Sequence, residues 1–537
     1  MVMNNSSKKL AWLPLVVAFA VVLGMFIGFY IQRNNSSRGD NIYLYPRSNK
    51  ILNVLKLIEA EYVDTISIDR LTDQTIVSLL KQLDPHSAYI PASELQAVTE
   101  PLEGNFSGIG VQFNMQNDTV VIVNTIPNGP SALIGIQAGD RIIKVNDTVV
   151  AGVKMSSDAI VKRLKGPRGT KVKVTIYRPS TRRQIDYDIT RNTIPLYSVD
   201  VSYMLAPQIG YIKINQFART TYDEFVTAIN KLHMEGMNKL IVDLRGNGGG
   251  YLDVAIKIAD QFLDENRLIV YTQGRAKPRE DFFATASGIC QSDSVIILID
   301  EFSASASEIL AGAIQDNDRG LIIGRRSFGK GLVQEQIPLS DGSALRLTVA
   351  RYYTPTGRCI QKPYAPGSDD YYKDITQRYL HGEFLTKDSI KLNDSLKYVT
   401  PGGRIVYGGG GIMPDIFIGI DTSEFSKLYN EITDRGLIYR FAFQFSDNNR
   451  ASLSKFKSVE ALRAELRKRN VLDLFIDYIR KQGINVNAND VKNSKRLITT
   501  QLEAYICRNF FDNQGFYPIM GEIDYTLKRA VEVFSKP

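Results

Sequence analysis

The spacing of apolar and polar positions changes along the chain, and each change predicts a different kind of structure. Apolar residues three and four positions apart at 51–58 predict an amphipathic helix, and a second helical run ends at Asp84-Pro85. His86 follows in a turn, where we expect it to be a buried turn residue, since no carboxylate or cysteine cluster indicates a ligand site. A linker and an N-terminal helical region are therefore predicted over 32–98.

From about residue 99 the period falls to two, and Gly, Pro, Asn and Asp turns separate the alternating runs. Short strands are expected at 111–113, 120–123 and 172–176, with a helix at 156–164. These elements predict a small β-rich domain over 99–190.

Farther along, strands alternate with helices. The runs at 209–214, 240–244 and 295–299 are expected to be strands, and those at 222–232 and 309–314 helices. This alternation predicts an α/β core over 191–420. Four glycines at 408–411 are expected to form a flexible turn before its last strand.

The last segment, 421–537, has helical periodicity, for instance at 462–467 and 472–479. We predict a C-terminal helical extension whose charged faces are solvated. No motif in it favours oligomerisation, partner docking or occlusion of a site over the other two roles.

Residues 10–31 form an apolar stretch long enough to span a bilayer, preceded by Lys8 and Lys9. The stretch is longer than the apolar part of a typical signal peptide, and no clear A-x-A cleavage site follows it. We therefore expect an uncleaved single-pass anchor with a cytoplasmic tail at 1–9, cleavage being the alternative. The rest of the chain would then be extracytoplasmic, which means periplasmic in a Gram-negative cell.

Charge and cysteine content narrow the functional classes. The 537 residues carry a net charge of +8, from 65 basic and 57 acidic residues that are scattered along the chain, which argues against nucleic-acid binding. The three cysteines lack C-x-x-C spacing, so neither a zinc site nor a disulfide framework is expected, and no cofactor is implied. The sequence has no G-x-S-x-G motif, and none of the three histidines is part of a His-Asp motif. A catalytic triad based on histidine is therefore not indicated.

Two short segments carry the candidate chemistry. Residues 303–308, Ser-Ala-Ser-Ala-Ser-Glu, lie where a buried strand turns into a helix, and residues 328–334 place Lys330 between two glycines. Each segment alone is commonly structural, as a helix cap or a turn. Together they indicate a serine nucleophile and a lysine base, because a desolvated amine can take a hydroxyl proton at neutral pH.

A third segment, 245–250, is rich in glycine and follows a predicted strand. Its glycines allow backbone amides to point at an anion. A phosphate-binding loop is the alternative, but no Lys-Ser or Lys-Thr pair follows and no G-x-G-x-x-G is present. Stabilisation of an oxyanion by a main-chain amide fits better. An amide beside the nucleophile and a glycine-turn amide can converge on one carbonyl oxygen, so Ala306 and Gly250 are the candidates.

The β-rich segment resembles a PDZ domain through its Ser-Gly-Ile-Gly-Val loop at 107–111 and an Ala-Gly-Asp-x-Ile-x-x-Val-Asn stretch at 138–146. The resemblance implies that the loop residues offer amides to a peptide carboxylate while the peptide adds a strand at the sheet edge. These residues are Gly108, Ile109, Gly110 and Val111. A small β domain without a ligand is the alternative.

From about Ile51 to Ile418 the chain resembles the carboxyl-terminal processing proteases, also called tail-specific proteases. Besides the PDZ-like segment, the resemblance rests on Leu-Asp-Pro-His-Ser at 83–87, Asp-Leu-Arg-x-Asn-x-Gly-Gly at 243–250, the segments at 303–308 and 328–334, Arg-Tyr-Tyr-Thr-Pro-x-Gly-Arg at 351–358, and Gly-Ile-x-Pro-Asp at 411–415. It implies a multidomain α/β fold with a crotonase- and ClpP-like ββα core and an inserted PDZ domain. The C-terminal extension departs from it.

The resemblance also implies residue roles. Ser305 would be the nucleophile, Lys330 the base, and Gln334, one helical turn beyond Lys330, the residue that orients the lysine. Ser303 and Ser307 match positions that are not nucleophilic in the family, so we expect them to cap and pack the helix. Glu308, in the first helical turn, is expected to be solvated or to pair with the helix dipole.

The resulting hypothesis is a membrane-anchored serine endopeptidase that recognises free C-terminal tails through its PDZ domain and forms an acyl-enzyme. One alternative is a catalytically inactive PDZ scaffold at the membrane, and another is a crotonase-type acyl-CoA enzyme. Protein or peptide substrates are the expected partners, with a homo-oligomer or a regulatory protein also possible. Arg168, in the turn at 166–170, is a candidate for coupling tail binding to activity.

Overall fold

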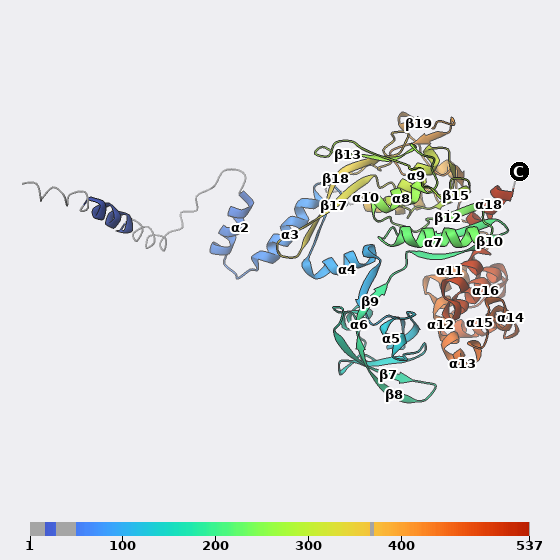
Figure 1. Ribbon diagram of the computed structural model, residues 1–537. Helices are drawn as coiled ribbons and strands as arrows, with labels where there is room; N and C mark the ends of the chain where they lie inside the picture. The colour runs from blue at the N-terminus through green and yellow to red at the C-terminus, as the bar shows by residue number, and fades with distance from the viewer. Residues whose placement is uncertain (1–16, 28–49, 366–369, 536–537) are drawn as a thin grey trace, which may run out of the picture. The chain divides into compact units, whose positions relative to one another are not determined.

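The computed structural model describes residues 17–27, 50–365 and 370–535 (Figure 1). They divide into two compact units, one ending at Leu79 and the other beginning at Leu80. The first unit contains a helix at 17–27, α2 (Lys50–Glu61) and most of α3 (Ile68–Lys81), so the two predicted N-terminal helices are confirmed.

The predicted anchor at 10–31 lies only partly within the described residues, and the tail at 1–9 lies outside them. Within the described part, residues 17–27 are helical. No helix among the described residues is both long and apolar enough to cross a membrane.

The α/β core is built on one mixed sheet with the strand order β10-β11-β12-β15-β16-β21. Its strands are β10 (Val199–Ala206), β11 (Ile209–Ile214), β12 (Lys239–Asp243), β15 (Ser294–Ile299), β16 (Gly320–Gly324) and β21 (Ile416–Phe417). β10 is antiparallel to β11, and the remaining neighbours are parallel. The three predicted core strands are confirmed, and α7 (Thr221–Met234) and α9 (Ala306–Asp316) confirm the predicted helices.

Both faces of this sheet are covered, which explains why its parallel strands read as continuous apolar runs. Alternate side chains such as Val242 and Ile297 pack in one cluster with residues of α7, α8 (Leu252–Asp260) and α9. The intervening side chains, such as Ile241 and Leu298, pack on the opposite face with Leu527 and Ala530 of α18 (Tyr525–Ser535). The end of the C-terminal extension is thus part of the protease core.

A second sheet has the order β1-β18-β13-β14, with β17 also paired to β18. Its strands are β1 (Ala88–Ile90), β13 (Leu268–Gln273), β14 (Glu280–Phe283), β17 (Leu332–Pro338) and β18 (Ala344–Tyr353). Gln334 therefore lies on a strand, and its predicted position one helical turn beyond Lys330 is wrong. The segment pairs antiparallel with β18, and this hairpin partner outweighs any local helical tendency.

The β-rich domain has a sheet of order β3-β4-β5-β7-β8 with β3 at its edge. The predicted strands and helix correspond to β3 (Val111–Gln116), β4 (Thr119–Thr125), β7 (Lys171–Arg178) and α6 (Ser157–Leu164) and are confirmed. The other elements are β2 (Asn105–Gly108), paired with β9 (Asn192–Pro195), and α5 (Pro130–Leu133), β5 (Arg141–Val145), β6 (Thr148–Val149) and β8 (Arg183–Thr190). The domain has a core of its own.

The C-terminal extension is helical, as predicted, and has a separate apolar core. Its elements are α11 (Lys427–Asp434), α12 (Leu437–Asn448), α13 (Arg450–Leu453), α14 (Val459–Lys468), α15 (Val471–Lys481), α16 (Ala488–Phe511), η4 (Asp512–Gly515), α17 (Tyr517–Gly521) and α18. Figure 1 shows α11 to α16 gathered in one bundle, coloured orange to red. Shorter connections contain α4 (Ala92–Glu103), α10 (Asp370–Leu380), η2 (Lys387–Ser389), η3 (Asp394–Leu396), β19 (Lys397–Val399) and β20 (Ile405–Tyr407).

Candidate active site

One cleft of about 950 Å³ brings the predicted catalytic residues together. Its lining includes Ser305, Lys330, Gln334, Gly250 and Ala306. These residues come from the turn before α9, the first residue of α9, the segment before β17, β17 itself and the glycine turn after β12. The cleft therefore has the residues that a serine-lysine hydrolase requires.

Ser305 lies in a sharp turn between β15 and α9, with φ 55° and ψ −114°. This is a conformation that residues other than glycine rarely adopt, and such strain is concentrated at functional sites. Ser303 and Ser307 are fully buried, and their hydroxyls donate to the carbonyl oxygens of Leu244 and Asn247 at 2.9 Å each. Of the three serines, only Ser305 lines the cleft.

The glycine turn packs directly against the nucleophile turn. The Ala304 amide donates to the carbonyl oxygen of Asn247 at 3.0 Å. A Cβ atom on Gly249 would lie 3.0 Å from the Ala306 nitrogen, and one on Gly250 would lie 2.1 Å from the Phe217 carbonyl oxygen. Only glycines permit this approach, which places the main chain of 249–250 beside the Ala306 amide, as an oxyanion site would need.

Lys330 has the electrostatic properties of a base. Burial and, to a smaller extent, the nearby Arg346 charge lower the pKa of its ammonium group to about 8, whereas Glu308 and Asp84 oppose the shift. A sizeable fraction of the side chain is consequently neutral near pH 8 and able to accept a proton.

Glu308 is completely buried, so the predicted solvated position is wrong, whereas the alternative prediction of pairing with the helix dipole agrees with its place in the first turn of α9. One carboxylate oxygen accepts from the Ser305 amide at 2.9 Å and the Lys330 amide at 2.8 Å. The other accepts from the Gly329 amide at 2.7 Å and the Ser327 hydroxyl at 2.5 Å. Burial raises the pKa of Glu308 to about 7, and the four hydrogen bonds oppose this shift. The first turn of a surface helix would be solvated, but here residues 327–330 cover it.

Tyr352, on β18, makes the complementary contact and was not predicted as a site residue. Its buried hydroxyl lies 2.7 Å from the Lys330 carbonyl oxygen and 3.2 Å from the Ser305 carbonyl oxygen. Glu308 and Tyr352 thus each connect the main chain of the nucleophile to that of the base. The only sequence signal was the position of Tyr352 within the motif at 351–358.

Gln334 is connected to the turn that follows α3. Its Nε2 donates to Thr348 Oγ1 at 3.3 Å, and Thr348 Oγ1 donates to Asp84 Oδ1 at 3.0 Å. The Ser87 hydroxyl donates to the other Asp84 oxygen at 2.6 Å. His86, predicted to be a turn residue, contacts the Tyr371 hydroxyl through Nε2 at 2.7 Å, and burial lowers its pKa to about 4. The turn thereby supports the strand that carries Gln334.

The predicted peptide loop, Gly108 to Val111, connects β2 to β3, away from the cleft lining. Gly110 has φ +74°, and a Cβ there would lie 3.0 Å from Ile194 Cδ1. The loop leads directly into the edge strand β3, where a peptide could add a strand. Arg168 lines a different surface hollow, together with Thr190 and Arg191.

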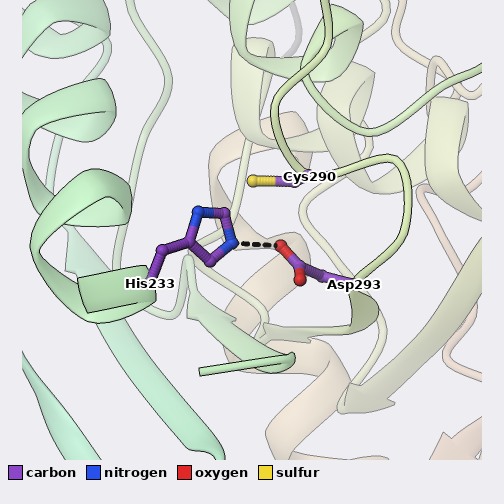
Figure 2. A group of neighbouring side chains, drawn as sticks. All are labelled: His233, Cys290 and Asp293. Carbon is purple, nitrogen blue, oxygen red and sulfur yellow. Dashed lines mark hydrogen bonds and ion pairs between the residues drawn. The ribbon is translucent and has the colours of Figure 1, made fainter. Parts of the chain in front are cut away.

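Figure 2 shows a separate cluster of His233, Cys290 and Asp293, whose possible metal-ligand atoms lie within 4.8 Å of one another. His233 Nε2 lies 2.8 Å from Asp293 Oδ2, and burial raises the pKa of the Cys290 thiol well above its usual range. The three side chains could hold a divalent cation if the thiol lost its proton. The Arg319 guanidinium opposes the binding of a cation, because it donates to the carbonyl oxygens of Cys290 and Asp293 and adds a positive charge there.

Comparison with known proteins assigns three segments to families. The profile of peptidase family S41 matches residues 208–367, that of a PDZ domain matches 107–189, and that of a family of unknown function (DUF8443) matches 428–512.

Similar curated proteins carry the same activity in their names. A "Carboxy-terminal-processing protease" from Bartonella bacilliformis is 36% identical over 347 residues, which cover 63% of this chain and 79% of that protein. A "Probable CtpA-like serine protease" from Staphylococcus aureus is 32% identical, over 66% of this chain and 72% of that protein. Among solved structures, a photosystem II D1 C-terminal processing protease is 25% identical, with a TM-score of 0.35, and the match covers 68% of this chain and 92% of that one.

Proposed function

Because the chain belongs to the carboxy-terminal-processing serine peptidases of family S41, we propose that it cleaves proteins near their C-terminal tails by a Ser305-Lys330 mechanism. The observation that carries this proposal is the single cleft that Ser305, Lys330, Gln334, Gly250 and Ala306 share.

In the first half-reaction, neutral Lys330 takes the proton of the Ser305 hydroxyl while the oxygen attacks the scissile carbonyl carbon. The amides of Gly250 and Ala306 would donate to the oxyanion that forms. When the C–N bond breaks, the ammonium of Lys330 gives its proton to the leaving amine. An acyl-enzyme on Ser305 remains.

In the second half-reaction, neutral Lys330 takes a proton from water, and the hydroxide formed attacks the ester carbonyl. Collapse of the intermediate releases the carboxylic acid, and the lysine returns the proton to Ser305. The Gln334 amide, held through Thr348, is suited to fixing the position of the lysine amine.

The PDZ domain supplies substrate selection in this proposal. Residues 108–111 would bind the terminal carboxylate through main-chain amides, and the tail would pair with the open edge of β3. The protein would act on free C-termini, since an amidated tail lacks the charge that the loop recognises.

The apolar stretch at 10–31 supports a membrane anchor with the protease on the extracytoplasmic side. Cell fractionation tests this part. The full chain should remain with membranes after a carbonate wash, and a chain beginning at residue 33 should not. Recovery of the full-length, uncleaved chain in the soluble fraction would contradict the anchor.

The catalytic part is tested with the full chain in detergent and an unfolded substrate that ends in a free apolar tail. The wild type should cleave this substrate, cleave its amidated form more slowly, and lose all cleavage upon Ser305→Ala. Cleavage that survives Ser305→Ala would exclude the proposed nucleophile. Tail binding without cleavage by the wild type would instead favour the inactive PDZ scaffold.

A further inference from the structure

The C-terminal helical domain contacts one face of the PDZ sheet at strands β3, β4 and β5. In the strand register, Asn114 of β3, Val121 of β4 and Arg141 of β5 lie side by side on this face. Val121 is only 2% exposed, yet it is not part of the PDZ core. Its two register neighbours both contact α12: Asn114 Nδ2 donates to the Tyr439 hydroxyl at 3.1 Å, and Arg141 pairs with Asp447.

One contact on this face is an ion pair between a partly buried arginine, 23% exposed, and a buried aspartate. Arg141 Nη2 lies 2.5 Å from Asp447 Oδ2, with the Asp447 side chain 3% exposed. Arg450 adds a second cation. Burial lowers the pKa of its guanidinium, the Asp447 charge raises it, and the Arg141 charge lowers it. Its Nε and Nη2 atoms are buried without a hydrogen-bond partner among the described residues. The negative charge of Asp447 therefore compensates the positive charges of both Arg141 and Arg450.

The fit is close at the edges of this contact as well. A Cβ on Gly139, next to the β5 strand, would lie 3.3 Å from Arg450 Cδ. Asn124 Nδ2, near the end of β4, lies 2.5 Å from Asp512 Oδ1 of η4. The contact thus involves three successive strands of the PDZ sheet and leaves β3 as an edge strand, with β4 as its only strand partner among the described residues.

The same helical domain is fixed to the protease core. Asp524, just before α18, accepts from Arg245 at 2.6 and 3.0 Å, and Tyr517 donates to Asp200 at 2.5 Å. Leu527 and Ala530 are buried against the main sheet. The domain thus contacts the core and the PDZ domain at the same time, and no described residue between 107 and 189 lines the catalytic cleft.

We propose that the C-terminal helical domain is a bracket whose partner is the PDZ domain of the same chain. By binding the outer face of the PDZ sheet through Tyr439, Asp447, Arg450 and Asp512, it fixes the PDZ domain at a constant distance from Ser305, clear of the cleft. The consequence for substrates rests on the proposed function. A constant distance between the PDZ domain and Ser305 restricts how far from its bound tail a substrate protein is cut.

The central test removes the shared carboxylate. Asp447→Asn leaves Arg141 and Arg450 facing each other without compensation, which should open the contact. Spin labels at Thr181→Cys in the PDZ domain and Met234→Cys in the core would report the distance between them. Cys359→Ser removes the partly exposed native thiol, and Cys290 and Cys507 are buried. Asp434→Asn, an exposed change elsewhere in the same helical domain, is the matched control.

Pulsed electron paramagnetic resonance on the full chain should give one narrow distance distribution for the parent and for Asp434→Asn. Asp447→Asn should give a distribution at least about twofold broader, because linked domains move freely unless their interface holds them. A broad distribution in the parent, or an unchanged narrow one in Asp447→Asn, would overturn the bracket. Should Asp447→Asn fail to fold, Arg141→Met tests the same contact from the PDZ side with the same expected broadening.

Mass spectrometry of the cleavage products separates the bracket from the proposed function. The parent should cut an unfolded tail substrate within a narrow window of positions, and Asp447→Asn should spread the cuts over a wider one. An unchanged window in a variant with a broadened distance distribution would overturn the claim about cut position. If the parent cleaved no substrate, the proposed function would be wrong. The distance measurement would still show whether the C-terminal helical domain fixes the PDZ domain.

Discussion

At the scale of single residues, the nucleophile and the base are connected through their main chains. Glu308 accepts hydrogen bonds from the amides of Ser305 and Lys330, and Tyr352 contacts the carbonyl oxygens of both. Misplacement of reacting groups by about 1 Å can cost a hundredfold in rate. We therefore assign Glu308 and Tyr352 to positioning.

Substitutions test this assignment. Glu308→Gln replaces one acceptor oxygen with an NH₂ group, which donates and cannot accept, so kcat should fall about a hundredfold with KM little changed. Tyr352→Phe should lower kcat about tenfold, through the loss of its hydrogen bonds. Tyr203→Phe is the matched control, because the buried Tyr203 hydroxyl has no hydrogen-bond partner in the described part of the chain. A Tyr352→Phe enzyme as active as Tyr203→Phe would refute the positioning role.

The pKa of Lys330 predicts the pH dependence of cleavage. The reactive form is the neutral amine, so kcat/KM should rise as pH increases toward about 8 and level off above it. Below that pH, protonation of the base should cost about tenfold for each unit, and protonation of Glu308, whose pKa burial raises to about 7, should add to the loss below pH 7. Steady-state rates between pH 6 and 10 measure this. A profile that falls as pH rises from 6 to 8 would exclude neutral Lys330 as the base.

The sequence predicted which residues belong to the site better than it predicted their burial and contacts. The five predicted residues of the cleft were found through motifs, which fix the order of residue types along the chain. The burial of Glu308 depends on residues 327–330, which contact it across the fold. A local pattern contains no information about such contacts, and so Glu308 and Tyr352 could not be assigned.

At the scale of elements, the glycine turn after β12 depends on its missing side chains. Gly250 has φ +149°, and an added Cβ would lie 2.1 Å from the Phe217 carbonyl oxygen. Gly250→Ala should therefore move the turn and abolish cleavage. Gly236→Ala has a comparable backbone penalty, at φ +89°, but open space around the new Cβ. It should cost only about 1 kcal/mol of stability and leave the rate unchanged. Equal rates in the two variants would show that the turn is not part of the site.

The elements also show where pattern reasoning was reliable. Apolar runs such as 295–299 identify a strand because both faces of the parallel sheet are buried. The segment 332–338 was misassigned because its strand character comes from pairing with β18, whose residues start six positions farther along the chain. Strand pairing depends on contacts between two separate segments, whereas helical spacing is visible within one segment.

At the scale of the whole molecule, the C-terminal extension and the protease core share a hydrophobic cluster. Leu527, 3% exposed, packs against the main sheet, so Leu527→Ala should lower the free energy of unfolding by about 2 to 5 kcal/mol. Leu474→Ala, at a side chain 44% exposed on α15, should cost less than about 0.5 kcal/mol. Urea unfolding followed by core tyrosine fluorescence compares the two. Similar losses would contradict a shared core.

The extension also marks the limit of what the sequence alone could predict about the whole molecule. Its helices were expected from their periodicity, but its contact with the outer PDZ face rests on single polar pairs such as Arg141-Asp447. Such pairs join residues about three hundred positions apart and leave no periodic signal. Domain order was thus visible in the sequence, whereas domain contacts were not.

The most direct test of the account is to identify the serine that becomes covalently modified. The full chain is treated with a serine-directed fluorophosphonate, and peptide mapping by mass spectrometry locates the adduct and follows its formation. We expect the adduct on Ser305 alone, forming about 10² to 10⁴ times more slowly in Lys330→Ala because the base is missing. An adduct on another serine, or equally fast labelling of Lys330→Ala, would contradict the Ser305-Lys330 mechanism.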